Sequence, residues 1–351
     1  HRDLHSFPTR RSSDLANRFA AWALGQGLGP GKTVALLLPN RAEYVPAWMG
    51  VSKIGAAAAL INSNLTGAAL AHCLSISGAS HVICDAESLA AIGTIRAGLA
   101  RPLTYWVIDA DVALSENQQR LDLRTPKLAP ERPPRSHRAG ITARDTALYI
   151  YTSGTTGMPK AAKIAHTRAQ LYMRAFAGAT GARADDRLYC ALPLYHSTGG
   201  LCGVGAALLN GATLVLRRKF SASHFWPDVI EQDCTVFVYI GELCRYLMNQ
   251  APSTQERQHR LRLGFGNGLR PEVWSEFEAR TGLTRMLEFY GSTEGNVSLF
   301  NFDGKVGAVG RVPGYLRHRF DVKLVRFDVD AEAPIRGGDG FCIPCTPGEV
   351  G

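Results

Sequence analysis

The sequence lacks any long uninterrupted hydrophobic run. Its longest weakly polar span, residues 199–216, is broken by Asn210 and Gly211. Because a transmembrane helix needs about 18 or more consecutive apolar residues, no such helix is predicted. The span instead predicts a buried helix over Leu201–Leu209, followed by a strand over Ala212–Leu216.

The sequence also has no internal repeat of solenoid length, no low-complexity tract, and no helix rich in Lys and Arg. The formal net charge is +9, a mild excess that suits anionic ligands such as nucleotides, coenzyme A or acidic lipid heads. Aromatic and basic residues do not interleave, so nucleic-acid binding is not expected. The basic cluster 217–219 is compatible with peripheral contact to a membrane surface, although a solvated turn is the more common explanation.

Paired cysteine motifs are scarce too. One C-x-x-C pair occurs at Cys342 and Cys345, with no second pair and no histidine partner after it. A zinc or redox role stays open, but two structural thiols are favoured. The other cysteines lie mostly in apolar runs, where a free thiol behaves as a small hydrophobe, a pattern that suits a reducing cytosol. They are Cys73, Cys84, Cys190, Cys202, Cys234 and Cys244.

Short apolar runs alternate with helical patterns along the chain of 351 residues. This alternation predicts an α/β fold with mainly parallel sheets and helices on both faces. Before residue 109 we expect strands over 33–39, 57–61, 80–84 and 103–108, and helices over 16–28, 41–55, 68–77 and 86–99. After residue 144 we expect strands over 146–151, 187–192, 235–240 and 261–265.

Two stretches interrupt this pattern. Residues 109–144 are polar and rich in proline, which predicts an excursion between two subdomains. Residues 321–327 open a more β-rich region, so we expect domains over 16–320 and 321–351.

The segment 1–15 has no apolar periodicity and reads like a translated sequencing adapter. A basic targeting peptide is the alternative, but the segment has no apolar core. We therefore expect it to lie loose on the surface and to contribute nothing to the fold.

A loop rich in glycine and hydroxyl groups follows the strand that ends near Tyr151. Its glycines let backbone N–H groups approach an anion closely, its hydroxyls add donors, and its final lysine adds a positive charge. This pattern predicts a polyphosphate site, although it is not the Walker pattern because Pro159 precedes the lysine. A polar surface turn is the alternative. The residues concerned are Thr152, Ser153, Gly154, Thr155, Thr156, Gly157 and Lys160.

A second motif, residues 288–296, combines an aromatic ring, hydroxyls and a carboxylate in a turn with glycines. The Tyr290 ring suits stacking on adenine, Thr293 suits an α-phosphate oxygen, and Glu294 suits Mg²⁺, which prefers oxygen ligands. The alternative is an ordinary loop with a capping hydroxyl and a first-turn glutamate.

Two further motifs complete the set. In residues 191–200, Tyr195 and His196 follow a strand, where parallel sheets present ligands. In residues 264–271, Asn267 or the backbone beside it is placed to read a base, and Arg270 is equally explained as a surface charge at a helix start.

The four motifs, in this order, resemble those of the adenylate-forming enzymes, which include acyl-CoA synthetases, luciferase and peptide-synthetase adenylation domains. They are most similar to the very-long-chain acyl-CoA synthetase or fatty acid transport protein branch. The resemblance covers about residues 16–351. It implies the fold of the N-terminal domain of that superfamily, with the mobile C-terminal domain and its second lysine beyond Gly351, so we expect this chain to be a gene fragment.

The resemblance also implies roles for individual residues. Lys160, Thr293, Glu294 and His196 are expected to be catalytic, with Glu294 on Mg²⁺ and His196 lining the carboxylate pocket. ATP would be held by Thr152, Ser153, Gly154, Thr155, Thr156, Gly157, Lys160, Asn267, Gly268, Tyr290, Gly291, Ser292 and Thr293.

The implied reaction activates a long- or very-long-chain fatty acid with ATP, first to an acyl-adenylate and then to acyl-CoA. Fatty acid, ATP and coenzyme A are the expected partners, with a location in the cytoplasm or on the inner face of a membrane. A fatty-acid uptake protein and a ligase for a bile acid or an aryl acid are the alternatives. The fragment itself is expected to make no acyl-CoA.

Overall fold

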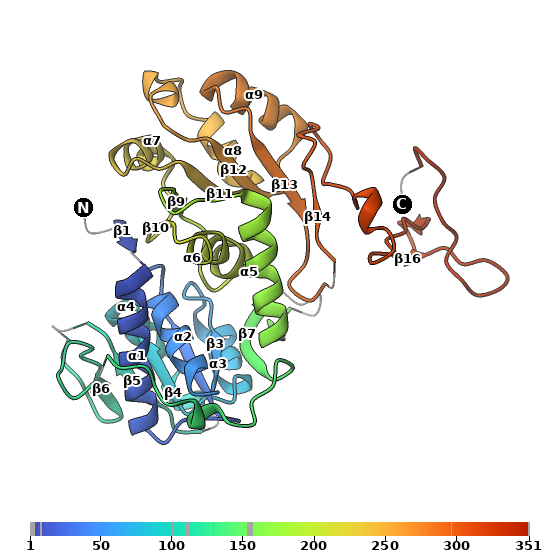
Figure 1. The fold of residues 1–351 in the computed structure, drawn as a ribbon. Helices are drawn as coiled ribbons and strands as arrows, with labels where there is room; N and C mark the ends of the chain where they lie inside the picture. The colour runs from blue at the N-terminus through green and yellow to red at the C-terminus, as the bar shows by residue number, and fades with distance from the viewer. Residues whose placement is uncertain are drawn as a thin grey trace.

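The computed structural model of the chain describes residues 4–7, 9–99, 101–109, 112–128, 130–152, 157–295 and 297–349, with side chains described from residue 12 onward. Two seven-stranded sheets are stacked one above the other, and helices cover them (Figure 1). This arrangement confirms the predicted α/β class.

The first sheet forms the lower half in Figure 1 and has the strand order β6-β5-β4-β2-β3-β7-β8. Its strands run parallel, except that β7 and β8 form an antiparallel pair. Apart from the half-buried first residues Thr33 and His81, strands β2 to β4 are apolar and buried, as expected for a parallel sheet covered on both faces. The bounds are β2 Thr33–Leu37, β3 Ala57–Leu60, β4 His81–Cys84, β5 Thr104–Val107, β6 Gln118–Arg120, β7 Thr146–Thr152 and β8 Lys160–Ala165.

The second sheet forms the upper half and has the order β1-β10-β9-β11-β12-β13-β14. Its central strands are parallel, and antiparallel pairs close both edges. The bounds are β1 Leu4–Phe7, β9 Arg187–Cys190, β10 Thr213–Arg217, β11 Val236–Ile240, β12 Leu263–Asn267, β13 Met286–Tyr290 and β14 Leu299–Phe300.

The helices pack on these sheets, and one contiguous core runs from Phe19 in the first half to Phe289 in the second. Of the helices in the described part of the chain, none combines the length and apolarity needed to cross a bilayer. Their bounds are α1 Thr9–Gly25, α2 Tyr44–Lys53, α3 Gly67–Ile76, α4 Ala86–Gly93, α5 His166–Thr180, α6 Val204–Leu208, α7 Ala222–Glu231, α8 Gly241–Met248 and α9 Pro271–Thr281. A π-helical turn, Thr198–Gly203, precedes α6, and short 3-10 turns span Arg96–Gly98, Arg135–Arg138, Thr254–Arg257 and Gly314–Leu316.

The expected role of residues 109–144 as the junction between subdomains is wrong. Strand β6 within this stretch pairs in parallel with β5 of the first sheet, and β7 after it belongs to the same sheet. The stretch is tied to α1, because Asn17 Nδ2 donates to Pro130 O at 2.6 Å and Arg18 Nη1 donates to Leu128 O at 2.8 Å. The chain instead passes from the first half to the second through α5, which follows β8 (Figure 1).

The expectation that residues 1–15 lie loose is also wrong for the described part of that segment. Leu4–Phe7 forms β1, which pairs antiparallel with β10 over the register Leu4↔Arg217 to Phe7↔Leu214. Helix α1 begins at Thr9, seven residues before the predicted start at Ala16, and Ser12 is buried. The segment therefore completes a sheet edge and the first turns of a helix.

At the other end, Arg311 still forms a bridge with Phe300, and the chain after it extends away from the stacked sheets (Figure 1). Strands β15 Phe327–Asp328 and β16 Ala333–Pro334 form a small antiparallel pair. Two isolated bridges are added by the pairing of Val325 with Pro344 and of Arg336 with Cys342. The β-rich region expected after Asp321 is therefore present as short pairings within mostly irregular chain.

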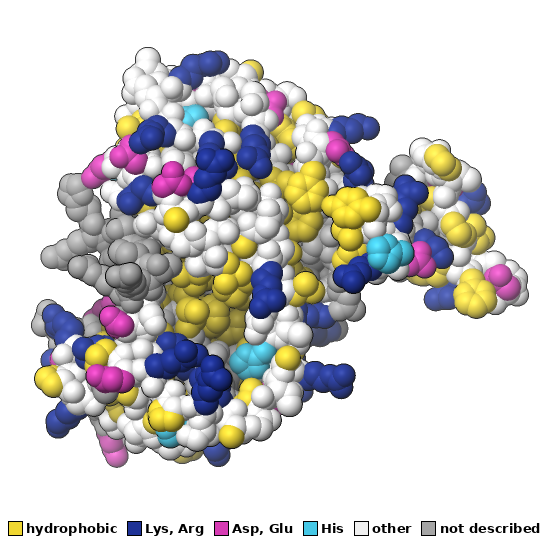
Figure 2. Space-filling view, viewed as in Figure 1, with side chains coloured by type: hydrophobic (Ala, Val, Ile, Leu, Met, Phe, Trp, Pro, Cys, Tyr) yellow, Lys and Arg dark blue, Asp and Glu magenta, His cyan; other side chains and the backbone are white. Residues whose placement is uncertain are grey.

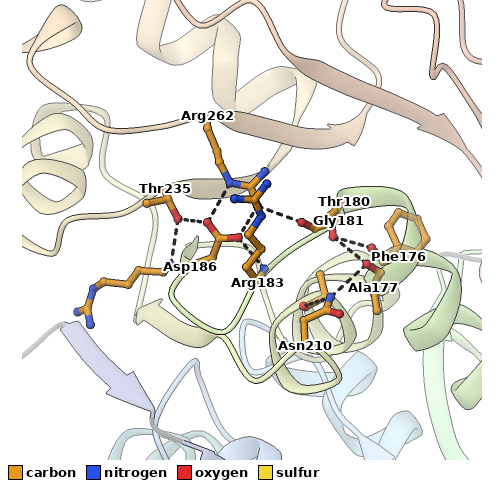
Figure 3. A network of polar contacts seen from close by, with 11 residues as sticks. Phe176, Ala177, Thr180, Gly181, Arg183, Asp186, Asn210, Thr235 and Arg262 are labelled. Atoms are coloured by element: carbon orange, nitrogen blue, oxygen red, sulfur yellow. Dashed lines mark hydrogen bonds and ion pairs between the residues drawn. The ribbon is translucent and has the colours of Figure 1, made fainter.

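A buried carboxylate fixes the amino ends of three strands of the second sheet (Figure 3). Asp186, just before β9, accepts hydrogen bonds from Thr235 Oγ1 at 2.6 Å and Arg262 Nε at 2.9 Å. It also accepts from Arg183 N at 2.7 Å. Thr235 and Arg262 immediately precede β11 and β12. The network therefore holds the amino ends of β9, β11 and β12 in register, and residues of the predicted site follow or end β9 and β12 at their carboxyl ends.

Candidate functional site

The predicted site residues gather where the carboxyl ends of strands from the two sheets approach each other. Thr152 ends β7 in the first sheet, while Asn267 and Tyr290 end β12 and β13 in the second. Ligands commonly bind at this edge of open α/β sheets. The two sheets are joined here by direct side-chain contacts, so motifs far apart in sequence form one site.

The glycine-rich loop connects two strands of a hairpin. Thr152 and Lys160 are paired directly across β7 and β8, which confirms that the loop follows a strand and shows that a second strand comes directly after it. Gly157 has a φ of +94°, which favours glycine. The Lys160 side chain is exposed. The predicted phosphate-binding residues Ser153, Gly154, Thr155 and Thr156 lie outside the described residues.

The turn after β13 reaches back to this hairpin. Thr152 Oγ1 donates to Glu294 Oε1 at 2.7 Å, and the hydroxyls of Ser197 and Thr293 lie 3.2 Å apart. Tyr290 is 57% exposed, so its ring face is open to a ligand. Three of the four predicted motifs are thereby in contact through their polar side chains.

Side chains of helix α5 hold the backbone of the turn after β13. The sequence did not predict these contacts. Arg168 Nη1 donates to Thr293 O at 3.2 Å and to Glu294 O at 2.8 Å. One helical turn later, Tyr172 OH donates to Ser292 O at 2.6 Å. Residues four apart lie on one helix face, so α5 presents both side chains to the turn. The sequence signal was only two polar side chains at that spacing.

Tyr195 and His196 follow β9 in the second sheet. Tyr195 is buried and accepts a hydrogen bond from Asn64 Nδ2 at 3.0 Å, which ties it to the loop after β3. The rings of Tyr195 and His196 have centroids 4.9 Å apart. The His196 ring is open to solvent on one side, yet the protein atoms around it desolvate it and lower its pKa below 6.5. A neutral imidazole is therefore favoured at pH 7.

Asn267, which was predicted to read the base, has a side-chain oxygen without a hydrogen-bond partner among the described residues. This Oδ1 atom is also buried. Gly268 follows with a φ of +79°, and Arg270 precedes Pro271 at the start of α9. A buried acceptor without a partner is costly. The strand register places the Asn267 side chain on the face of the sheet opposite to that of Tyr290.

The residues present fit a magnesium ion that is shared with phosphate oxygens. No group of three or more His, Cys, Asp or Glu side chains close enough to hold a metal occurs in the part of the chain that the structure describes. Glu294 supplies one carboxylate, and the Thr152 hydroxyl lies beside it. Mg²⁺ bound with substrate phosphates commonly takes only one or two carboxylates from the protein. Protein-only binding of the metal is therefore not expected.

A cavity of about 390 Å³ lies beside Tyr195, between the carboxyl edges of the sheets. Asn40, Asn64 and Arg218 contribute to its walls together with Tyr195. Figure 2 shows apolar side chains gathered between the upper and lower halves of the molecule, flanked by Lys and Arg side chains. The junction of the two halves therefore combines apolar surface with positive charge.

Comparison with known proteins assigns the family. The model of the AMP-binding enzyme family matches residues 10–339. The chain belongs to this family. It is 44% identical over 344 residues to the rat long-chain fatty acid transport protein 1, covering 97% of this chain and 52% of that protein. It is 43% identical over 332 residues to the mouse long-chain fatty acid transport protein 3, covering 92% of this chain and 48% of that protein. The chain thus spans about half the length of these curated relatives.

Solved structures confirm the fold. The N-terminal domain of FACL13 from Mycobacterium tuberculosis superposes with a TM-score of 0.72 at 26% identity, covering 95% of this chain and 78% of that one. The anthranilate CoA ligase AuaEII superposes with a TM-score of 0.78 at 23% identity, covering 93% of this chain and 62% of that one. The predicted N-terminal domain of the adenylate-forming fold is therefore confirmed.

Proposed function

We propose that this AMP-binding chain is the nucleotide-binding part of an enzyme that activates long-chain fatty acids, first to acyl-adenylates and then to coenzyme A thioesters. The observation that carries the proposal is the contact of Thr152 with Glu294 and of Ser197 with Thr293 at one strand edge. The fatty acid is proposed because the curated relatives at 43–44% identity are named long-chain fatty acid transport proteins.

In the proposed first step, a fatty-acid carboxylate oxygen forms a bond to the α-phosphorus of ATP. The bond to the β-phosphate breaks, and pyrophosphate leaves with the electron pair. Both reactants are anions, so the protein must align them and neutralise charge rather than transfer a proton. A bound Mg²⁺ would supply charge neutralisation at the phosphates.

The chain's own residues divide this task. Lys160 brings a positive charge to the end of the hairpin, and Thr152 orients the Glu294 carboxylate. Arg168 and Tyr172 hold the backbone of the turn that carries Thr293 and Glu294. The ring of His196 packs on that of Tyr195, which lines the cavity, and the proposed role of His196 is to limit access of water to the carboxylate.

In the proposed second step, the thiolate of coenzyme A attacks the acyl carbon, and AMP leaves. This half-reaction is proposed for the full-length gene product, because the chain spans only about half of its relatives. The test uses that product with fatty acids of graded length, with pyrophosphate exchange reporting the first step and formation of the coenzyme A thioester reporting the second. ATP–pyrophosphate exchange that depends on a long-chain acid supports the proposal, while exchange only with a bile acid or an aryl acid contradicts the substrate class.

Fatty-acid uptake is a second candidate, favoured by the printed names of the relatives. Uptake of labelled fatty acid by cells that express wild type or the Lys160→Ala variant separates the two functions. If uptake is driven by activation, Lys160→Ala lowers uptake and pyrophosphate exchange together, each about a hundredfold. Uptake that persists in a variant without exchange favours a transport function independent of ATP chemistry.

A further inference from the structure

Asn40 of the first half is hydrogen-bonded to two segments of the second half. It lies three residues after β2. Asn40 Nδ2 donates to Leu192 O at 2.8 Å and to Arg217 O at 3.1 Å. Asn40 Oδ1 accepts from Leu194 N at 2.9 Å. One side chain therefore joins the first sheet to the segments at the carboxyl ends of β9 and β10.

These three bonds require an amide. Asn40 is only 4% exposed, so the polar groups that it meets need partners within the protein. An amide offers two N–H donors and an oxygen acceptor, and here both donors meet carbonyl oxygens while the oxygen meets an N–H group. A carboxylate would place an oxygen against two carbonyl oxygens, and a leucine would remove all three bonds. The residue type at position 40 is therefore set by backbone groups more than 150 positions away.

The segment that Asn40 holds is also packed against the π-helical turn Thr198–Gly203. A Cβ atom on Gly199 would lie 2.6 Å from Pro193 O, and one on Gly200 would lie 2.1 Å from Leu194 O. Backbone thus packs directly on backbone at this point. The segment cannot shift without either losing the bonds to Asn40 or clashing with the turn.

The same loop carries side chains of the predicted site. The β9 loop (Leu192–Ser197) is held at a second point, because Asn64 Nδ2, after β3, donates to Tyr195 OH at 3.0 Å. At the end of the loop, the Ser197 hydroxyl lies 3.2 Å from that of Thr293. Two asparagines of the first half thus fix a loop of the second half whose end contacts the turn after β13.

The proposed reaction needs groups from both halves in a fixed relation. Lys160 lies on the first sheet, whereas His196 and Thr293 follow strands of the second. Two anionic reactants must be aligned between them, and a misplacement of about 1 Å can cost about a hundredfold in rate. Bonds that tie the β9 loop to the first sheet should therefore affect the rate of the chemical step more than the binding of ATP.

We propose that Asn40 and Asn64 are positioning residues for adenylation, which set the place of the β9 loop, and hence of His196 and Ser197, relative to the first sheet. This inference rests on the proposed function, because it takes adenylation as the reaction. The two asparagines act through the loop and not through contact with ATP.

The test measures two quantities for the full-length gene product. They are the rate of ATP–pyrophosphate exchange at saturating ATP and fatty acid, and the dissociation constant of Mg·ATP from calorimetry without fatty acid. In Asn40→Leu the exchange rate should fall about tenfold or more, while the dissociation constant stays within about threefold of the wild-type value. A loss of rate without a loss of ATP binding indicates positioning, because a partly unfolded sample loses both together.

Asn301→Leu is the matched control. Asn301 is 3% exposed, and its Nδ2 donates to Lys305 O at 2.7 Å and to Ala308 O at 2.8 Å. Its Oδ1 accepts from Lys305 N at 3.2 Å, so the kinds of bond are the same as at Asn40, but none joins the two halves. This variant should lower the melting temperature and leave the exchange rate within about twofold of wild type. An equal loss of rate in both leucine variants overturns the inference.

Asn64→Ala tests the second bond without a buried lesion, since Asn64 is exposed. Its exchange rate should fall about threefold. Tyr195→Phe removes the other partner of the same bond and should lower the rate equally. Should Asn40→Leu fail to fold, this pair decides the question, and wild-type rates in both variants overturn the inference.

Two further outcomes separate the inference from the function beneath it. If wild type catalyses exchange and Asn40→Leu folds but keeps the wild-type rate, the positioning role is wrong and the proposed function stands. If wild type catalyses no exchange with any carboxylic acid, both are overturned.

Discussion

Thr152 Oγ1 donates a hydrogen bond to Glu294 Oε1 at 2.7 Å, across 142 positions of sequence. This bond joins the last residue of β7 in the first sheet to the turn after β13 in the second. Both side chains are near the surface, so the bond contributes little to stability. The bond instead orients a side chain. The Thr152 hydroxyl, at the start of the glycine-rich loop, fixes the direction of the Glu294 carboxylate, which is proposed to bind Mg²⁺.

The first prediction concerns this bond in the full-length gene product. Thr152→Val removes the hydroxyl and keeps the β-branched shape, so the strand should be preserved. Adenylate formation, measured by ATP–pyrophosphate exchange, should fall about tenfold or more, as is typical when a residue that orients a metal ligand is lost. Thr146→Val, at the other end of the same strand, is the control and should stay within about twofold. Equal rates in both variants would remove Thr152 from the mechanism.

The second prediction concerns the two charges proposed to act on phosphate. Lys160→Ala and Glu294→Ala should each lower pyrophosphate exchange about a hundredfold, because loss of one preorganised charged group commonly costs that much. Both side chains are exposed, so the free energy of unfolding should change by less than about 0.5 kcal/mol. Lys163→Ala removes another exposed lysine of β8 and should leave exchange intact. Near-normal exchange in either active-site variant contradicts the assignment.

Most strands, and the position of the glycine-rich loop after one of them, could be predicted because their signals are local. Continuous apolar runs such as residues 33–37 indicate strands buried on both faces. The strand β1 and the pairing of β6 could not be predicted in this way. Leu4 pairs with Arg217 across more than 200 positions, and neither Leu4–Phe7 nor Gln118–Arg120 has the apolar pattern of a central strand.

The same limit applies inside the site. Tyr290, Thr293 and Glu294 stand in one recognisable motif, whereas the contacts of Arg168 with Thr293 and of Tyr172 with Ser292 join residues more than 110 positions apart. Glu288 was part of a recognised motif, but its hydrogen-bond partners Tyr239 and Leu269 come from two other segments. Such contacts follow from strand register, which single-sequence patterns do not specify.

The third prediction concerns stability and pH at the amino ends of the strands. Burial alone raises the pKa of Asp186, but hydrogen bonds from Arg262, Thr235 and Arg183 N outweigh burial and lower the pKa below 3.8. A carboxylate whose folded pKa is depressed stabilises the protein above its unfolded pKa of about 3.9. That stabilisation is lost as the pH falls through the folded value.

Asp186→Asn should therefore lower the free energy of unfolding at pH 7 by about 3 kcal/mol, since it leaves the Arg262 guanidinium without its charged partner. Urea denaturation at a series of pH values is the measurement. The gap between wild type and Asp186→Asn should be constant from pH 7 to about pH 5 and should shrink below about pH 4. A gap that does not depend on pH would show that the ionised carboxylate is not the source of the stabilisation. Asp330→Asn, an exposed control, should leave stability unchanged.

The fourth prediction concerns the close approach of α8 to the turn after β12. Gly241 is buried, and a Cβ atom there would lie 1.8 Å from Gly268 O and 2.4 Å from Gly268 C. These are backbone atoms of a turn that Glu288 already holds through Leu269, so they cannot move aside without displacing Asn267. Gly241→Ala should destabilise the protein by about 1–3 kcal/mol, the usual range for forced overpacking, and should weaken ATP binding about tenfold or more.

Gly178→Ala provides the matched comparison, because it makes the same chemical change within α5. A Cβ atom at Gly178 meets nothing within 4 Å, and alanine favours the helix over glycine by up to about 1 kcal/mol. This variant should therefore be more stable than wild type and should bind ATP normally. Urea denaturation and calorimetry with Mg·ATP measure both quantities for each variant. If Gly241→Ala behaves like Gly178→Ala, the turn tolerates displacement, and its fixed position is not needed for ATP binding.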